Sequence, residues 1–147
     1  MKLNIVAILL GILCLSTISC MKPRVKFDDS VWGDNATITA AVLFRYTEVT
    51  NNLGYGEPVT GYQNVAVATK SNTIDKTGFT VNIVAVKGTD LSKIGIRFSH
   101  YAKLITPLDG APAAGIIADF TKGKFVYQLT SADGTVRDWT VNIAVEP

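Results

Sequence analysis

The chain has 147 residues, of which 48% are hydrophobic, and its formal net charge is only +2. This length fits a single domain, and a nearly balanced charge without a basic stripe between aromatic residues argues against a nucleic-acid partner. One histidine and two cysteines are too few ligands for the common zinc sites.

The first 20 residues predict an export signal that ends in a lipidated cysteine. Lys2 provides the positive start, and an apolar run covers residues 5–15. This run has the length of a signal-peptide core and is too short to cross a bilayer as a helix. We therefore expect residues 1–19 to be a lipoprotein signal peptide and Cys20 to carry the acyl chains that hold the protein on a membrane.

The residues before Cys20 match the lipobox motif of bacterial lipoproteins only loosely, because Thr17 lies three positions before the cysteine, where leucine is usual. An ordinary secretory signal with an incidental Cys20 is the alternative. After cleavage Cys20 is the remaining cysteine, so we expect no intrachain disulfide. Residues 20–35 are predicted to be the lipidated cysteine and a tether. The expected location is the outer membrane, on its periplasmic face or on the cell surface.

From residue 36 onward the large apolar residues recur at every second position, which predicts strands with one buried face. The clearest alternation runs through Phe125, Tyr127 and Leu129 and then from Trp139 to Val145. The strand candidates are residues 36–50, 62–69, 79–86, 94–100, 113–120, 125–130 and 139–145. About seven strands predict that residues 36–147 form a single all-β domain, an immunoglobulin-like antiparallel β-sandwich.

Turn residues separate these candidates. Asp133-Gly134 lies between two strongly alternating segments and predicts a tight hairpin. Residues 90–93 could add a short helical turn, and residues 107–112, with a proline at each end, are expected to be a rigid surface loop.

The second half resembles a known family. The motifs are Gly88-Thr89-Asp90-Leu91-Ser92, Asp119-Phe120-Thr121 and Asp133-Gly134-Thr135 followed by Trp139-Thr140-Val141. Over residues 72–147 they resemble the immunoglobulin-like, cadherin-like β-sandwich domain of lipoproteins from Gram-negative gut bacteria. That domain often precedes one assigned to carbohydrate binding or metabolism, so the resemblance implies the fold, the location and a link to glycans. Its motif residues are structural.

Catalytic chemistry has few candidates, and we expect no enzyme, no cofactor and no metal site. His100 is the single histidine, and the adjacent Ser99 would point to the opposite face of a strand. A triad from distant residues stays open as an alternative, as does a calcium site near Asp28, Asp29 and Asp34. We expect the acidic residues to lie mostly in turns.

Aromatic residues are the best candidates for ligand contacts. The alternation predicts that Trp139 belongs to the core, whereas Tyr55 lies between two glycines in a predicted exposed loop. Tyr55 together with Tyr62 or Trp32 could form a small binding platform. Tyr46 and Tyr101 are the other aromatic residues considered for stacking on a sugar.

The sequence thus predicts a non-enzymatic envelope lipoprotein that acts as a binding or adaptor module, with a glycan or an envelope protein as partner. The alternative is a structural spacer that pairs with a partner protein through a strand edge.

Overall fold

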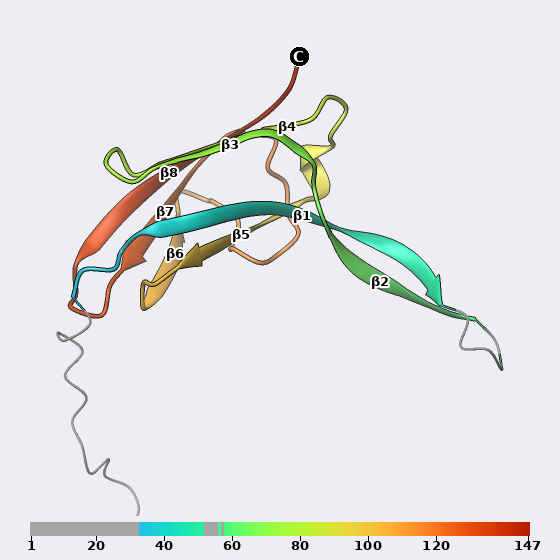
Figure 1. The fold of residues 1–147 in the computed structure, drawn as a ribbon, viewed down its shortest axis with the longest axis horizontal. Helices are drawn as coiled ribbons and strands as arrows, with labels where there is room; N and C mark the ends of the chain where they lie inside the picture. The colour runs from blue at the N-terminus through green and yellow to red at the C-terminus, as the bar shows by residue number, and fades with distance from the viewer. Residues whose placement is uncertain (1–32, 52–55, 57) are drawn as a thin grey trace, which may run out of the picture.

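The computed structural model describes residues 33–51, 56 and 58–147. These residues form eight strands and one short 3₁₀ helix, arranged as two facing sheets (Figure 1). The elements are β1 (Ile38–Asn51), β2 (Val59–Ala66), β3 (Thr69–Asp75), β4 (Thr80–Ala85), η3 (Leu91–Lys93), β5 (Gly95–His100), β6 (Leu104–Leu108), β7 (Lys124–Thr130) and β8 (Val136–Val145). The predicted all-β sandwich is confirmed. Among these residues no helix has the length and apolar character needed to span a membrane.

One sheet has three strands in the order β2-β1-β5, and the other has five in the order β3-β4-β8-β7-β6. The long strand β1 pairs with β5 through its first half and with β2 through its second half. Phe44 is the residue where the two pairings meet, because it lies opposite Gly95 of β5 and Ala66 of β2. The second half of β1 therefore continues past the edge of β5.

The prediction of a purely antiparallel sandwich is wrong in one place, since β4 and β8 pair in parallel. Their register aligns Val81 with Val141 and Ile83 with Ile143, so the apolar residues of both strands point to the same layer. Parallel neighbours need a long connection between them, and the whole segment from η3 to β7 provides it.

The core lies between the two sheets. Phe125, Tyr127 and Leu129 are buried, as the alternation predicted, and Trp139 is fully buried. The polar atoms of the two largest rings have partners, as buried polar groups require. Trp139 Nε1 donates to the carbonyl oxygen of Ala36 at 3.0 Å, and Tyr127 Oη donates to that of Pro112 at 2.8 Å.

Three local predictions are wrong. Residues 62–69 do not form one strand, because the chain leaves β2 after Ala66 and joins the other sheet as β3. Residues 113–120 contain no strand; they form an isolated bridge between Ala118 and Ile94, just before β5, and a backbone hydrogen bond from Gly115 to Ile96 of β5. The predicted rigid loop begins inside β6, which includes Pro107; a proline is tolerated there because β6 is an edge strand.

The two predicted turns are present. Asp90 caps η3, and its Oδ1 accepts a hydrogen bond from the backbone nitrogen of Ser92 at 2.9 Å. Residues 131–135 join β7 to β8, with Gly134 at a positive φ of 90°.

The start of the described chain lies against the last strand. Asp34 forms an ion pair with Arg137 of β8, and Ser131 Oγ donates to the carbonyl oxygen of Gly33 at 3.4 Å. The chain therefore enters the sandwich beside the β7–β8 turn. The paired ends of β1 and β2 project from the opposite end of the molecule (Figure 1).

Candidate functional site

A two-stranded ribbon projects from the sandwich (Figure 1). It consists of residues 45–51 of β1 and 59–65 of β2, which pair beyond the last contact of β1 with β5; we name it the arm. Its side chains are exposed apart from the half-buried Val49 and Gly61. A two-stranded ribbon is only marginally stable in water without further packing. Because the side chains of the arm are exposed, both of its faces are available to a binding partner.

The strand register shows which side chains share a face of the three-stranded sheet. Directly opposite residues project to the same side, and neighbours along a strand alternate. Leu43 points into the core, whereas Phe44 points away from it and is buried outside the main core cluster. We name the face that carries Phe44 the outer face; it also carries Tyr46, Glu48, Tyr62, Asn64 and Arg97.

Phe44 is buried on the outer face by its neighbours. A Cβ at Gly95 would lie 2.4 Å from the Phe44 ring, so only glycine leaves room for the ring there. The Arg97 guanidinium lies 4.7 Å from the ring centroid, which is cation–π distance. Arg97 Nη2 also donates to Asn64 Oδ1 at 2.9 Å. The rings of Tyr46 and Phe44 pack edge to face, with 6.0 Å between their centroids. These contacts give the base of the arm a defined polar and aromatic surface.

Tyr46 and Tyr62 are diagonal neighbours on this surface. Tyr46 lies opposite Asn64, and Tyr62 lies opposite Glu48, which places the two tyrosines on adjacent strands two positions apart in register. Diagonal neighbours have a typical Cα separation of about 7–8 Å, within reach of aromatic side chains. Tyr46 is 55% exposed and Tyr62 is 73% exposed. The arm therefore presents two tyrosine rings to solvent on one face.

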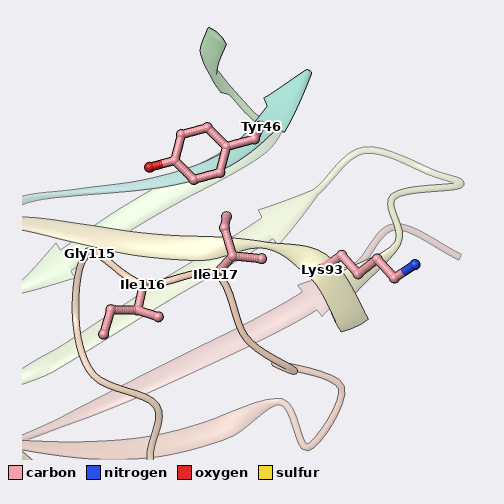
Figure 2. A pocket seen from close by; sticks show the side chains of 5 residues that line it. All are labelled: Tyr46, Lys93, Gly115, Ile116 and Ile117. Carbon is pink, nitrogen blue, oxygen red and sulfur yellow. The ribbon is translucent and has the colours of Figure 1, made fainter. Parts of the chain in front are cut away.

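A pocket of about 550 Å³ opens beside Tyr46. Figure 2 shows the Ile117 side chain extending toward Tyr46, while the Lys93 side chain extends away from both. Gly115 and Ile116 complete the lining, and Ile116 is 59% exposed although it is aliphatic. This volume is within the range of small-molecule sites.

The 113–118 segment is held in place by β5. The backbone nitrogen of Gly115 donates to the carbonyl oxygen of Ile96 at 2.7 Å, and that of Ala118 donates to Ile94 at 2.8 Å. The φ of +85° at Gly115 favours glycine and turns the chain, which leaves Ile116 facing solvent.

Two smaller pockets, of about 200 and 270 Å³, adjoin the arm base and share Arg45, Val67 and Thr89. The first of them also shares Tyr46 and Lys93 with the larger pocket. We name the three together the arm-base cleft. Its basic residues are Arg45, Lys87 and Lys93, so an anionic or hydroxyl-rich ligand would meet hydrogen-bond donors there.

Of the predicted contact residues, the structure describes Tyr62 but not Trp32 or Tyr55. Tyr62 lies on the outer face of the arm, whereas Trp32, Tyr55 and the lipidation candidate Cys20 lie outside the described residues. Tyr46, one of the aromatic residues considered, lines the cleft. Lys93 and Ile116 were missed, because nothing in the local sequence shows that the η3 and 113–118 segments meet the arm.

Many of the described carboxylates are engaged in turns or in the two ion pairs, Asp34 with Arg137 and Glu146 with Lys70. Hydrogen bonds lower the pKa values of four turn aspartates. At three of them a side-chain hydroxyl bond is the largest cause, followed by the bond from the backbone nitrogen two residues later, and at Asp75 the bonds come from the backbone nitrogens of Gly78 and Thr77. The four aspartates are Asp75, Asp90, Asp119 and Asp133. A side-chain bond from Arg137 likewise lowers the pKa of Asp34. No group of three His, Cys, Asp or Glu residues within this part of the chain is placed to hold a metal ion.

His100 ends β5, as expected, and is half-buried. Its Nδ1 atom is buried and makes no hydrogen bond in the described structure.

Comparison with known proteins adds two likenesses. Residues 87–142 match the model of the DUF5018-related family, which covers less than half of the chain. No curated protein matches the chain significantly. The fold is similar to the crystal structure of a "putative secreted protein" from Bacteroides fragilis NCTC 9343, with a TM-score of 0.60 and 22% identity over 77% of this chain and 97% of that one. The chain is thus a small β-rich domain with DUF5018-related sequence in its second half and the fold of this Bacteroides protein.

Proposed function

We propose that the chain is a non-enzymatic binding module of the bacterial envelope that captures a glycan at the base of its arm. The observation that carries this proposal is the pair of solvent-facing tyrosines, Tyr46 and Tyr62, on one face of a projecting ribbon beside a pocket. Neighbouring exposed aromatic residues contribute to apolar surface patches, and contiguous patches of this kind often mark binding sites.

The chemistry of the arm base suits a sugar. A sugar ring has an apolar C–H face that can stack on an aromatic ring, and hydroxyl groups that need donors and acceptors around its rim. Tyr46 and Tyr62 provide amphipathic rings. Asn64 and Arg97 provide side-chain amide and guanidinium groups next to them, held by their mutual hydrogen bond. Lys93 also lines the pocket, although its side chain extends away from Tyr46 (Figure 2).

The envelope location is supported by the sequence and the fold likeness. The export signal at residues 1–19 and Cys20 predict a lipid anchor, and the similar Bacteroides protein is described as secreted. The chain enters the sandwich at the end opposite the arm (Figure 1). An anchor at Cys20 would therefore leave the arm pointing away from the membrane. We also propose that residues 72–147 belong to the immunoglobulin-like, cadherin-like domains of gut-bacterial lipoproteins.

A glycan array probed with the full chain tests the ligand class. We expect hits that weaken at least about tenfold, equivalent to 1.4 kcal/mol, in Tyr46→Ala and in Tyr62→Ala. Tyr101→Ala is the matched control, because Tyr101 is 75% exposed and follows β5, away from the arm. An array without hits would contradict the proposal, and so would an equal loss of binding in the Tyr101→Ala control.

Metabolic labelling with a palmitate analogue tests the anchor. The wild-type chain should incorporate the label, and Cys20→Ser should abolish it, because that sulfur is the proposed acylation site. Labelling that persists in Cys20→Ser would contradict a lipid anchor at this position.

A second function, assembly with a protein through a strand edge, is favoured by one observation. The edge strand β2 is eight residues long and contains no charged residue. Unprotected edges of this kind are templates for strand addition.

A further inference from the structure

The two sheets end in four edge strands, β2 and β5 in one and β3 and β6 in the other. An edge strand carries backbone N–H and C=O groups without sheet partners, and proteins protect such strands against unwanted pairing. The usual protections are charges, proline, bulges, short strands or a covering segment.

Three of these edges are protected. The β3 edge carries Lys70 and Asp75, and its register with β4 shifts before Ser71. The β6 edge is five residues long and includes Pro107. The β5 edge is covered by the 113–118 segment through the backbone bonds described above.

Within residues 33–51, 56 and 58–147, nothing gives the β2 edge any of these protections. Its sequence, Val-Thr-Gly-Tyr-Gln-Asn-Val-Ala, lacks charge and proline, and its register with β1 runs unbroken over eight pairs. Its side chains are exposed apart from the half-buried Gly61. Because it lies on the projecting arm, an added strand would not meet the body of the sandwich along most of its length (Figure 1).

We propose that the partner of this edge is β2 of a second copy of the same chain, paired antiparallel about a two-fold axis. This proposal rests on the second function above and names its partner. A two-fold axis brings the strand against itself, so any charge on it would approach its own copy. The absence of charge on β2 removes that repulsion, which directly opposed like charges would otherwise cause.

The β2 sequence is also self-complementary about Tyr62. In a register centred there, Tyr62 faces its own copy, Val65 faces Val59, and Asn64 faces Thr60. Aromatic pairs and pairs of β-branched residues are among the cross-strand combinations that stabilise antiparallel sheets. The same register therefore matches these aromatic, polar and β-branched residues with their own kind and places Gln63 opposite Gly61.

The pairing would join the two outer faces. Antiparallel strands related by a two-fold axis perpendicular to the ribbon keep equivalent faces on the same side, so Tyr46 and Tyr62 of both copies would form one continuous aromatic surface. Such a dimer would bind a polymeric ligand at two points, which raises its avidity without new contacts.

Sedimentation velocity on the full chain, in detergent micelles kept in large molar excess, tests the dimer. Gln63 projects from the face opposite Tyr62, and the two Gln63 residues would be diagonal neighbours across the new pairing. We expect concentration-dependent dimers of the wild-type chain. Gln63→Lys and Gln63→Glu should each lower the dimerisation constant at least about tenfold. An equimolar mixture of the two variants should restore it, because opposite charges then approach each other.

Thr47→Lys is the matched control, because Thr47 is directly opposite Gln63 on β1, shares its face and lies one strand inward from the edge. It should dimerise like the wild-type chain. A chain that stays monomeric at all concentrations would overturn the proposal, and so would equal losses in Gln63→Lys and Thr47→Lys or a mixture without recovery. Binding of a monovalent sugar should be unchanged in both Gln63 variants, so failure of the dimer is distinguishable from failure of the glycan site.

Discussion

At the scale of single residues, the outer face depends on a glycine. Phe44 can lie flat against β5 because Gly95 has no side chain, and the Ile116 carbonyl oxygen would be only 2.8 Å from a Cβ at that position. Neither neighbour is the flexible end of a long side chain, so the strain of an added methyl group cannot relax easily.

We therefore expect Gly95→Ala to lower the free energy of unfolding by about 1–3 kcal/mol, as overpacking does in a well-packed site. Urea unfolding followed by circular dichroism measures the change. Gly61→Ala is the control, because no heavy atom lies within 4 Å of a Cβ there, and it should stay within about 0.5 kcal/mol of the wild-type chain. Equal effects of the two substitutions would contradict this packing of Phe44.

The residues of the core were predictable, whereas those of the outer face were not. Tyr127 and Trp139 lie in strands with strict alternation, and that pattern alone indicates which side is buried. Phe44 follows the buried Leu43, so both faces of β1 are covered at this point. Its burial depends on Gly95 and Arg97, about 50 residues further along the chain, and no local pattern reports such a contact.

At the scale of elements, aspartate turns recur in the connections between the strands. In Asp90, Asp119 and Asp133 the carboxylate accepts the backbone N–H of a Ser or Thr two residues later. Side-chain hydroxyl bonds strengthen this arrangement, and all three pKa values are lowered. Each of these bonds favours the ionised carboxylate in the folded chain.

We expect the chain to lose stability in acid. A carboxylate whose pKa in the folded chain is below its unfolded value of about 3.9 stabilises the folded state at pH values above the unfolded pKa. This stabilisation is lost as the pH falls through the lowered pKa of the folded chain. Thermal unfolding at pH 7 and pH 3 should show a lower Tm at pH 3.

The double variant Asp119→Asn/Asp133→Asn should show a smaller drop in Tm between the two pH values than the wild-type chain, because the amides keep an acceptor oxygen but do not titrate. Identical pH dependence in the two proteins would rule out these turns as its cause.

Some strands could be predicted from the sequence and others could not, because the strands differ in how their faces are buried. β4, β7 and β8 have one clearly buried face, so they follow the period of two. β2 is exposed on both faces, and its sequence therefore has no alternation that marks where it ends and β3 begins. Residues 113–117 are rich in small and apolar residues, yet the positive φ at Gly115 ends any extended run.

At the scale of the whole molecule, the arm and the sandwich differ in how they are stabilised. The sandwich has a continuous core, whereas the arm has a single ribbon with both faces exposed. Regions with few buried apolar contacts open more often than the core does.

In dilute solution, where dimers are absent, backbone amides of β2 should exchange with deuterium much faster than those of β8. Hydrogen exchange read by mass spectrometry on peptides from the full chain measures the difference. Exchange from β2 as slow as that from β8 would show that the arm is more firmly held than its exposure indicates.

The sequence predicted the layered β architecture but not the site, because the site is assembled from distant segments. Tyr62 was predicted as a contact residue, but the pocket residues Tyr46, Lys93 and Ile116 come from β1, η3 and the 113–118 segment. They meet only because β1 pairs with β2 and β5 at once, and this choice of partners is a property of the complete fold.

The last strand, β8, is the middle strand of the five-stranded sheet. A ribosome makes the chain from the N-terminus, so nothing can occupy the centre of that sheet until residues 136–145 have been synthesised and released. Until then, β4 and β7 lack the neighbour that lies between them, and the five-stranded sheet cannot form. For a protein proposed to be exported through a narrow channel, this order of synthesis keeps the five-stranded sheet from closing before β8 has been made.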